Sequence, residues 1–190
     1  MGSNPTPSVA IIMRIFTAFE LPEKIKDEIY KIVSEKSPKI SGVKWVEKEN
    51  LHITCKFLGE INEKQLEELI SKLQEKLNKG EKVRISITNF GCFPNFRNPR
   101  VLWLGVQGEV DRLQKIWATL EEISKNLKIG EREKDYVPHV TLGRVKSQIS
   151  LDKDWIKYSS KEFEITHLTV FQSTLTPSGP IYKSIAKIGL

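Results

Sequence analysis

Two short tripeptides combine residue types that suit proton transfer. Residues 52–54 read His-Ile-Thr and residues 139–141 read His-Val-Thr, so two of the three histidines in the chain occupy one pattern. Histidine exchanges a proton near neutrality because its unperturbed pKa is about 6.5. In the cleavage of a phosphate ester, a neutral imidazole can take a proton from the attacking oxygen while an imidazolium gives one to the leaving oxygen.

Each tripeptide begins a stretch in which apolar and polar residues alternate, which is typical of a half-buried strand. Side chains alternate between the two faces of a strand, so His52, Thr54 and Lys56 are predicted to share one face. His139 and Thr141 are predicted to share the equivalent face of the second strand. There the threonine hydroxyls could donate hydrogen bonds to phosphoryl oxygens. The opposite faces are expected in the core and hold Leu51, Ile53, Cys55, Phe57, Val140 and Leu142.

A third tripeptide of the same type occurs at His167-Leu-Thr169, which lowers the weight that repetition alone can carry. It lacks the Phe-Leu-Gly and Leu-Gly-Arg continuations that follow the other two tripeptides. We therefore expect His167 to be structural or peripheral, and we assign the chemistry to His52 and His139.

Hydrophobic periodicity indicates the elements that must position these residues. Apolar residues recur at helical spacing in residues 23–36, in a stretch capped by Asn62 and in residues 109–127. Strands are predicted at residues 14–19, 43–46, 51–58, 83–90, 101–106, 138–145, 163–171 and 181–188. This order of elements predicts an α+β fold with largely antiparallel sheets.

The composition fits one folded domain with an anionic partner. Hydrophobic residues make up 39% of the 190 residues, and the formal net charge is +6. No apolar run approaches the roughly 20 residues of a membrane span, and Cys55 and Cys92 lack neighbours at ligand spacing. We expect a cytoplasmic protein with no membrane span, no metal and no other cofactor. Residues 1–12 carry neither charge nor periodicity, and we exclude them from the fold as a tag or extension.

The two motifs in their context resemble a known family. The sequences LHITCKFLGE at residues 51–60 and PHVTLGRV at residues 138–145 are similar to the signature pair of the 2H phosphoesterases. MRIFTAFELP at residues 13–22 and WVEKENLHITCKFLGE at residues 45–60 support the likeness. The branch that the chain resembles is that of the RNA 2′,3′-cyclic phosphodiesterases, also called 2′-5′ RNA ligases.

The resemblance implies a single bilobal domain over residues 13–190. Its two largely antiparallel sheets would be related by pseudo-twofold symmetry around a central cleft, with helices on the outside. It implies hydrolysis of RNA 2′,3′-cyclic phosphate ends to 2′-phosphates, with His52 as the general acid and His139 as the general base. ATP-independent 2′-5′ RNA ligation would be a second activity, and the substrate would be tRNA-derived RNA bound by a monomer.

Several further residues are candidates for substrate binding. Arg144 matches a family arginine near the phosphate, but strict alternation would turn it away from His139, so a bulge at Gly143 is needed to bring it round. Phe96, Arg97 and Arg100 lie in a loop that mixes aromatic and basic residues, a combination that binds single-stranded RNA by stacking and charge. The alternative is a surface loop with its phenylalanines turned inward. Lys56 would either meet phosphate or lie on a solvated rim.

Two other functions stay open. A 2H-like module could hold a nucleotide or RNA without turning it over. The chain could also be an RNA-binding protein with incidental histidines, for which salt-sensitive binding without turnover would be the sign.

Overall fold

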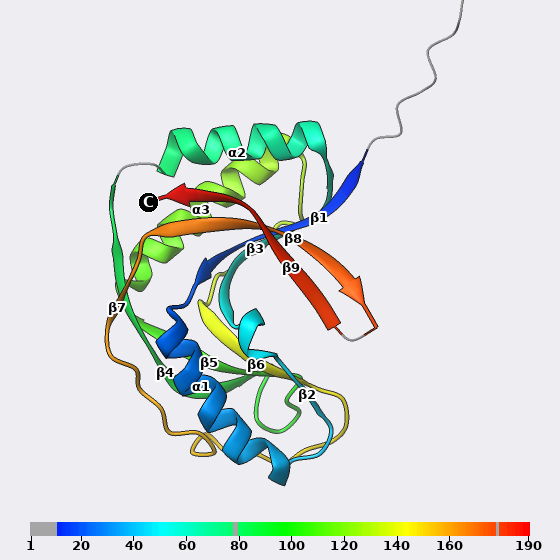
Figure 1. Cartoon of the computed structure of the whole chain (residues 1–190), viewed down its shortest axis with the longest axis vertical. Coiled ribbons are helices and arrows are strands. Elements are labelled where there is room, and N and C mark those ends of the chain that lie inside the picture. The colour runs from blue at the N-terminus through cyan, green and yellow to red at the C-terminus, as the bar shows by residue number, and fades with distance from the viewer. Residues whose placement is uncertain (1–10, 78–79, 178) are drawn as a thin grey trace, which may run out of the picture.

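The computed structural model describes residues 11–77, 80–177 and 179–190 (Figure 1). In this part of the chain three α-helices lie among nine strands. The helices are α1 (Glu23–Lys36), α2 (Glu63–Leu77) and α3 (Val110–Leu127). The strands are β1 (Ile12–Glu20), β2 (Val43–Trp45), β3 (His52–Asn62), β4 (Val83–Phe93), β5 (Val101–Gly108), β6 (His139–Val145), β7 (Phe163–Ile165), β8 (His167–Thr176) and β9 (Gly179–Gly189).

Local sequence accounts for where the helices begin and which face they bury. At the start of α2, the Asn62 side chain accepts a hydrogen bond from Gln65 N at 2.9 Å, and the Gln65 side chain accepts one from Asn62 N at 3.1 Å. This reciprocal capping satisfies two backbone donors, as predicted for Asn62. Helix α3 ends at Leu127, and the residue that caps it, Lys128, has a left-handed φ of 55°. Each helix buries a stripe at helical spacing, such as Leu66, Leu69 and Leu73 in α2.

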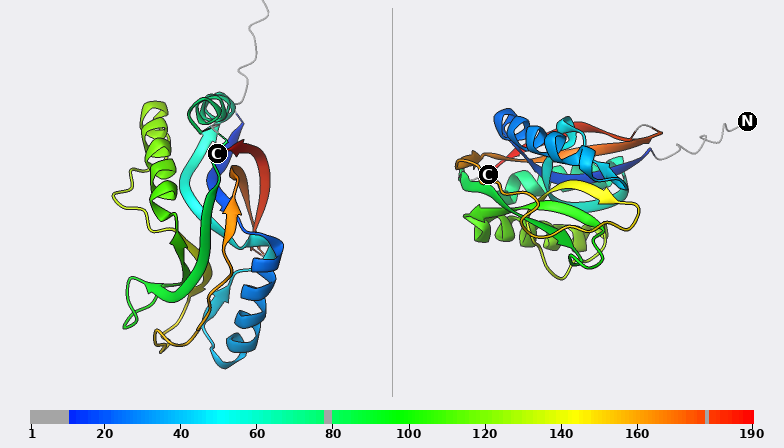
Figure 2. Two further views of the ribbon diagram at one scale, coloured as in Figure 1. Left: turned by 90° about the vertical axis from the view of Figure 1, so that its left-hand side faces the viewer. Right: turned by 90° about the horizontal axis from the view of Figure 1, so that it is seen from below.

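The strands form one largely antiparallel sheet that curls into a half-barrel (Figure 2). Its strand order is β7-β4-β5-β6-β3-β1-β8-β9, and β2 pairs with β6 beside this path. The predicted α+β class and the antiparallel pairing are confirmed. The two predicted sheets are two halves of this one sheet, and a single antiparallel pair, Ile53 opposite Val140, joins them.

The helices cover the sheet on its outer side, as predicted. Helix α1 lies beside the half that contains β4, β5 and β6, whereas α2 and α3 pack on each other at the other end of the molecule (Figures 1 and 2). One cluster of buried side chains runs through both halves, so the halves share a core. The predicted extension lies outside the described residues except for residues 11 and 12, and β1 already begins at Ile12. No described helix is long and apolar enough to cross a membrane.

Candidate active site

The join between the two halves brings the two tripeptides side by side. Ile53 and Val140, the middle residues of the tripeptides, are fully buried and stand opposite each other in antiparallel register. Carrying this register one residue further in each direction sets His52 beside Thr141 and Thr54 beside His139, all on the face opposite the buried pair. The two histidines are then diagonal neighbours, on the order of 7–8 Å apart. We call this surface the histidine face.

Each imidazole is oriented by the same backbone contact. His52 Nδ1 lies 2.7 Å from the carbonyl oxygen of Asn50, and His139 Nδ1 lies 2.7 Å from that of Val137. A carbonyl oxygen only accepts, so Nδ1 carries the hydrogen in both rings and Nε2 is left for chemistry. His52 Nε2 is 2.9 Å from the hydroxyl oxygen of Thr54, which links the imidazole and the hydroxyl of that tripeptide.

A β-bulge follows the threonine in both copies. In β3, Thr54 and Lys56 face consecutive residues of β1, so the intervening Cys55 is extra. In β6, Thr141 and Gly143 face consecutive residues of β5, so Leu142 is extra. One extra residue reverses the alternation that follows it. The bulge expected at Gly143 is therefore present, and it returns Arg144 to the histidine face, where its charge contributes to lowering the pKa of His139.

The bulge in β3 overturns the prediction for Lys56. The residue does not share a face with His52: its side chain is fully buried on the side of α3. There Lys56 Nζ forms an ion pair with Glu121 and donates a hydrogen bond to the carbonyl oxygen of Glu131 at 2.7 Å. The prediction failed because the alternation was continued through Cys55, where the strand carries its extra residue. Lys56 can therefore neither meet a phosphate nor lie on a solvated rim.

Phe57 was predicted in the core and is instead 52% exposed. It follows His52 by five residues, as Arg144 follows His139, so the two side chains take equivalent places in the two halves. The ring centroid of Phe57 is 5.8 Å from that of Phe16, which in turn is 5.3 Å from His52. Tyr182 packs edge-on against His52 at 5.5 Å. This aromatic group around His52 was missed by the sequence analysis. The signal for Phe57 was its spacing, because it follows His52 at the same distance as Arg144 follows His139.

Burial lowers the pKa of both histidines. For His52 burial is the largest cause and the charges of Lys26 and His139 add to it, while the bond to Asn50 opposes it, and the pKa falls to about 4. Burial also lowers the pKa of His139, and the charge of Arg144 acts in the same direction. Both imidazoles are therefore mainly neutral at neutral pH.

The remaining predicted residues lie in varied surroundings. His167 is exposed and its Nδ1 is 2.7 Å from the hydroxyl of Thr166. Its tripeptide partner Thr169 is buried and donates to Glu20 at 2.9 Å, so the threonine of this tripeptide does not contact the imidazole as Thr54 contacts His52. Phe96 is half-buried with its ring 5.9 Å from that of Phe90, as in the alternative of inward-turned phenylalanines. Arg97 and Arg100 are exposed.

Comparison with known protein families also divides the chain into two successive stretches. The family described as "LigT like Phosphoesterase" matches two successive stretches of the chain, residues 19–103 and 104–182. Each stretch contains one of the paired tripeptides. The chain belongs to the LigT-like phosphoesterase family. The resemblance seen in the motifs is thus confirmed, and with it the assignment to a family of phosphoesterases.

Relatives and solved structures of the family extend over nearly the whole chain. The RNA 2′,3′-cyclic phosphodiesterase of Methanocaldococcus jannaschii is 41% identical over 91% of this chain and 98% of its own length. A protein of the same description from Aquifex aeolicus is 36% identical over 94% and 98%. Thermus thermophilus TT0787 superposes with a TM-score of 0.80 at 26% identity, covering 94% of this chain and 98% of that one. Escherichia coli LigT complexed with 3′-AMP has the same fold, with a TM-score of 0.80 at 20% identity over 95% and 99%.

Proposed function

We propose that the protein hydrolyses 2′,3′-cyclic phosphate ends of RNA to 2′-phosphates, with His52 and His139 as an acid–base pair. The observation that carries this proposal is the Ile53–Val140 register, which gathers two imidazoles and two hydroxyls on one face. The names of the relatives, RNA 2′,3′-cyclic phosphodiesterase, supply the substrate class.

In the proposed reaction, neutral His139 takes a proton from water through Nε2 as the water oxygen attacks phosphorus. The bond between phosphorus and O3′ breaks, and protonated His52 gives its proton to O3′, which leaves the 2′-phosphate. Thr54 and Thr141 donate hydrogen bonds to the non-bridging oxygens, and Arg144 balances their charge during transfer. His139 then holds a proton and His52 lacks one, so exchange with solvent restores the starting state.

The lowered pKa of His52 limits when this residue can carry the proton of the general acid. His52 has a pKa of about 4, so at neutral pH only a small fraction of it carries the proton that the acid needs. The cyclic phosphate bears a negative charge, which raises the pKa of any imidazole beside it. We therefore propose that substrate binding promotes protonation of His52, while His139, close to Arg144, is kept neutral as the base.

The surroundings of the two histidines differ in a way that would orient a nucleotide. Phe57 is exposed beside Phe16 and His52, and an exposed ring can stack on a nucleobase whatever its sequence. Arg144 takes the equivalent place in the other half, and a guanidinium recognises phosphate oxygens. We place the terminal base on the Phe57 side and the phosphate charge on the Arg144 side.

Ligation would use the same groups. If an RNA 5′-hydroxyl replaces the attacking water, the same proton transfers join two strands through a 2′-5′ bond without ATP. We keep this as a second proposed activity, together with the tRNA-derived substrate, the monomeric state and the cytoplasmic location.

One experiment distinguishes metal-free hydrolysis from metal-dependent hydrolysis and from binding without turnover. Purified protein is incubated in EDTA with a short RNA that ends in a 2′,3′-cyclic phosphate, and the product is identified. We expect turnover to a 2′-phosphate. Activity that EDTA abolishes and a divalent ion restores would refute the metal-free mechanism. Tight binding without turnover would favour the binding module instead.

A further inference from the structure

A basic hollow of about 500 Å³ lies at the end of β6, next to Arg144. One wall is formed by residues 97–100 and the other by residues 145–149. Its charged residues are Arg97, Arg100 and Lys146, all exposed, and none of the residues that line it is acidic.

Each wall of this hollow follows a residue that contacts His139 or acts on its charge. The first follows Phe93, whose ring packs edge-on against His139 with centroids 5.1 Å apart. The second follows Arg144, whose charge lowers the pKa of His139. Lys44 stands directly opposite Arg144 in the β2–β6 register, so its side chain lies on the same face. Exposed cations therefore continue from the histidine face into the hollow.

The walls are held in place before any ligand binds. Arg100 N donates to the carbonyl oxygen of Phe93 at 2.7 Å, and Val145 N donates to that of Arg100 at 2.9 Å. The Asn95 side chain accepts hydrogen bonds from the backbone N–H of Arg97, at 3.0 Å, and of the following residue, at 3.1 Å. A preorganised site loses less conformational entropy when it binds.

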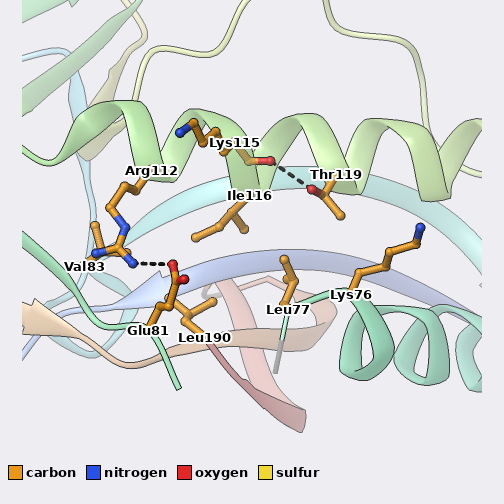
Figure 3. A pocket seen from close by; sticks show the side chains of 9 residues that line it. All are labelled: Lys76, Leu77, Glu81, Val83, Arg112, Lys115, Ile116, Thr119 and Leu190. Carbon is orange, nitrogen blue, oxygen red and sulfur yellow. Dashed lines mark hydrogen bonds and ion pairs between the residues drawn. The ribbon is translucent and has the colours of Figure 1, made fainter. Parts of the chain in front are cut away.

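Among the described residues the basic hollow contains no ion pair, whereas a second hollow of the molecule contains one, beside Lys76 and Lys115. Between α2 and α3 lies a space of about 220 Å³ in which Arg112 is paired with Glu81 (Figure 3). By contrast, Arg97, Arg100 and Lys146 have no ion-pair partner within the described residues. Clustered like charges repel unless an anion neutralises them, and the phosphates of RNA are such anions.

We propose that this hollow binds a backbone phosphate of the RNA strand that carries the cyclic phosphate, upstream of its terminal nucleotide. The proposal deepens the function proposed above and rests on it. Lys146 follows Thr141 by five positions and comes directly after the end of β6, which corresponds to a distance of about 15 Å. A phosphate held there belongs to a nucleotide further along the strand. The enzyme should then prefer an oligonucleotide over a mononucleotide with the same reactive end.

The test compares two substrates, 2′,3′-cyclic AMP and a tetranucleotide that ends in 2′,3′-cyclic AMP. The test variant is Arg97→Ala/Arg100→Ala/Lys146→Ala. The matched control, Lys76→Ala/Lys115→Ala/Lys125→Ala, removes the same charge from exposed residues of α2 and α3, at the end of the molecule opposite β2 (Figure 1). In the test variant we expect kcat/KM for the tetranucleotide to fall by about tenfold or more. The value for 2′,3′-cyclic AMP should stay within about twofold of wild type, and the control should change neither.

Salt provides a second readout, because each phosphate contact that is lost reduces the slope of log kcat/KM against log salt by about 0.7 for a single strand. An equal loss on both substrates, or no loss on either, would overturn the proposal. If the wild type turns over neither substrate, the function proposed above fails. The hollow is then judged by binding of a tetranucleotide that ends in 2′-phosphate, which only the test variant should weaken; unchanged binding would refute the hollow as well.

Discussion

The half of the sheet that carries His52 and the half that carries His139 have the same backbone arrangement around the histidine but different side chains beyond it. In each, Nδ1 of the histidine contacts the carbonyl oxygen two residues earlier, and a bulge follows the threonine. Beyond the bulge one half presents Phe57 and the other Arg144. The features that both halves have fix the geometry of the two histidines. The residues that differ, Phe57 and Arg144, give an aromatic surface on one side and a cationic surface on the other.

The largest effects are expected from the part that the halves share. His52→Ala and His139→Ala should each lower kcat by about 10²- to 10⁴-fold, the range for one general acid or base. Both side chains lie on the histidine face, so thermal unfolding should change little. His167→Ala is the matched control, and its kcat should stay close to that of wild type. A large loss in that variant, or near-normal turnover in either of the other two, would show that the wrong pair was assigned.

The divergent residues should separate binding from chemistry. Arg144→Gln removes a charge that acts on the phosphate in the transition state, so we expect kcat to fall by about 10²-fold. Phe57→Ala removes a stacking surface and should raise KM by about tenfold with little change in kcat. Steady-state kinetics on a short RNA with a cyclic phosphate end measure both. The same pattern of kcat and KM in the two variants would remove the distinction between the two surfaces.

Lys56 tests the fold of the first half. Lys56→Met leaves Glu121 and the carbonyl of Glu131 without their buried partner, so we expect a loss of about 3 kcal/mol in the free energy of unfolding. Lys56→Met/Glu121→Gln removes the unpaired charge and should recover part of this loss. Denaturant unfolding of wild type and both variants provides the values. A Lys56→Met variant as stable as wild type would contradict the buried ion pair.

A smaller effect concerns stability against pH. The pKa of His52 is about 4 in the folded protein, and about 6.5 is expected in the unfolded chain. Between these values the unfolded state binds a proton that the folded state does not. Stability from this group is therefore complete above pH 6.5 and is lost as the pH falls toward 4. The decline measured by denaturant unfolding should be shallower in His52→Gln, and an equal slope would contradict the lowered pKa.

Local sequence patterns predict the elements and the paired motifs but not the bulges. The alternation around His52 and His139 was enough to place the histidine and the threonine of each tripeptide on the same face of their own strand, because each tripeptide lies before the extra residue of that strand. Lys56 and Phe57 lie after Cys55, and they were assigned to the wrong faces for that reason. For Arg144 the family resemblance pointed to a bulge near Gly143, and β6 has one there. The joining of two sheets through Ile53 and Val140 depends on a contact between distant residues, which periodicity does not report.

The division of roles between the two histidines is tested most directly by the pH dependence of kcat/KM for an RNA 2′,3′-cyclic phosphate. Burial lowers both pKa values, to about 4 for His52 and below 6.5 for His139, so we predict a bell-shaped profile with its maximum between about pH 4 and 6.5. The two apparent pKa values belong to the coupled pair. His139→Ala, which lacks the base, should lose the acidic limb, and His52→Ala, which lacks the acid, should lose the basic limb. The opposite losses would reverse the two roles. A flat profile from pH 4 to 9, with the chemical step rate-limiting, would contradict two-histidine catalysis altogether.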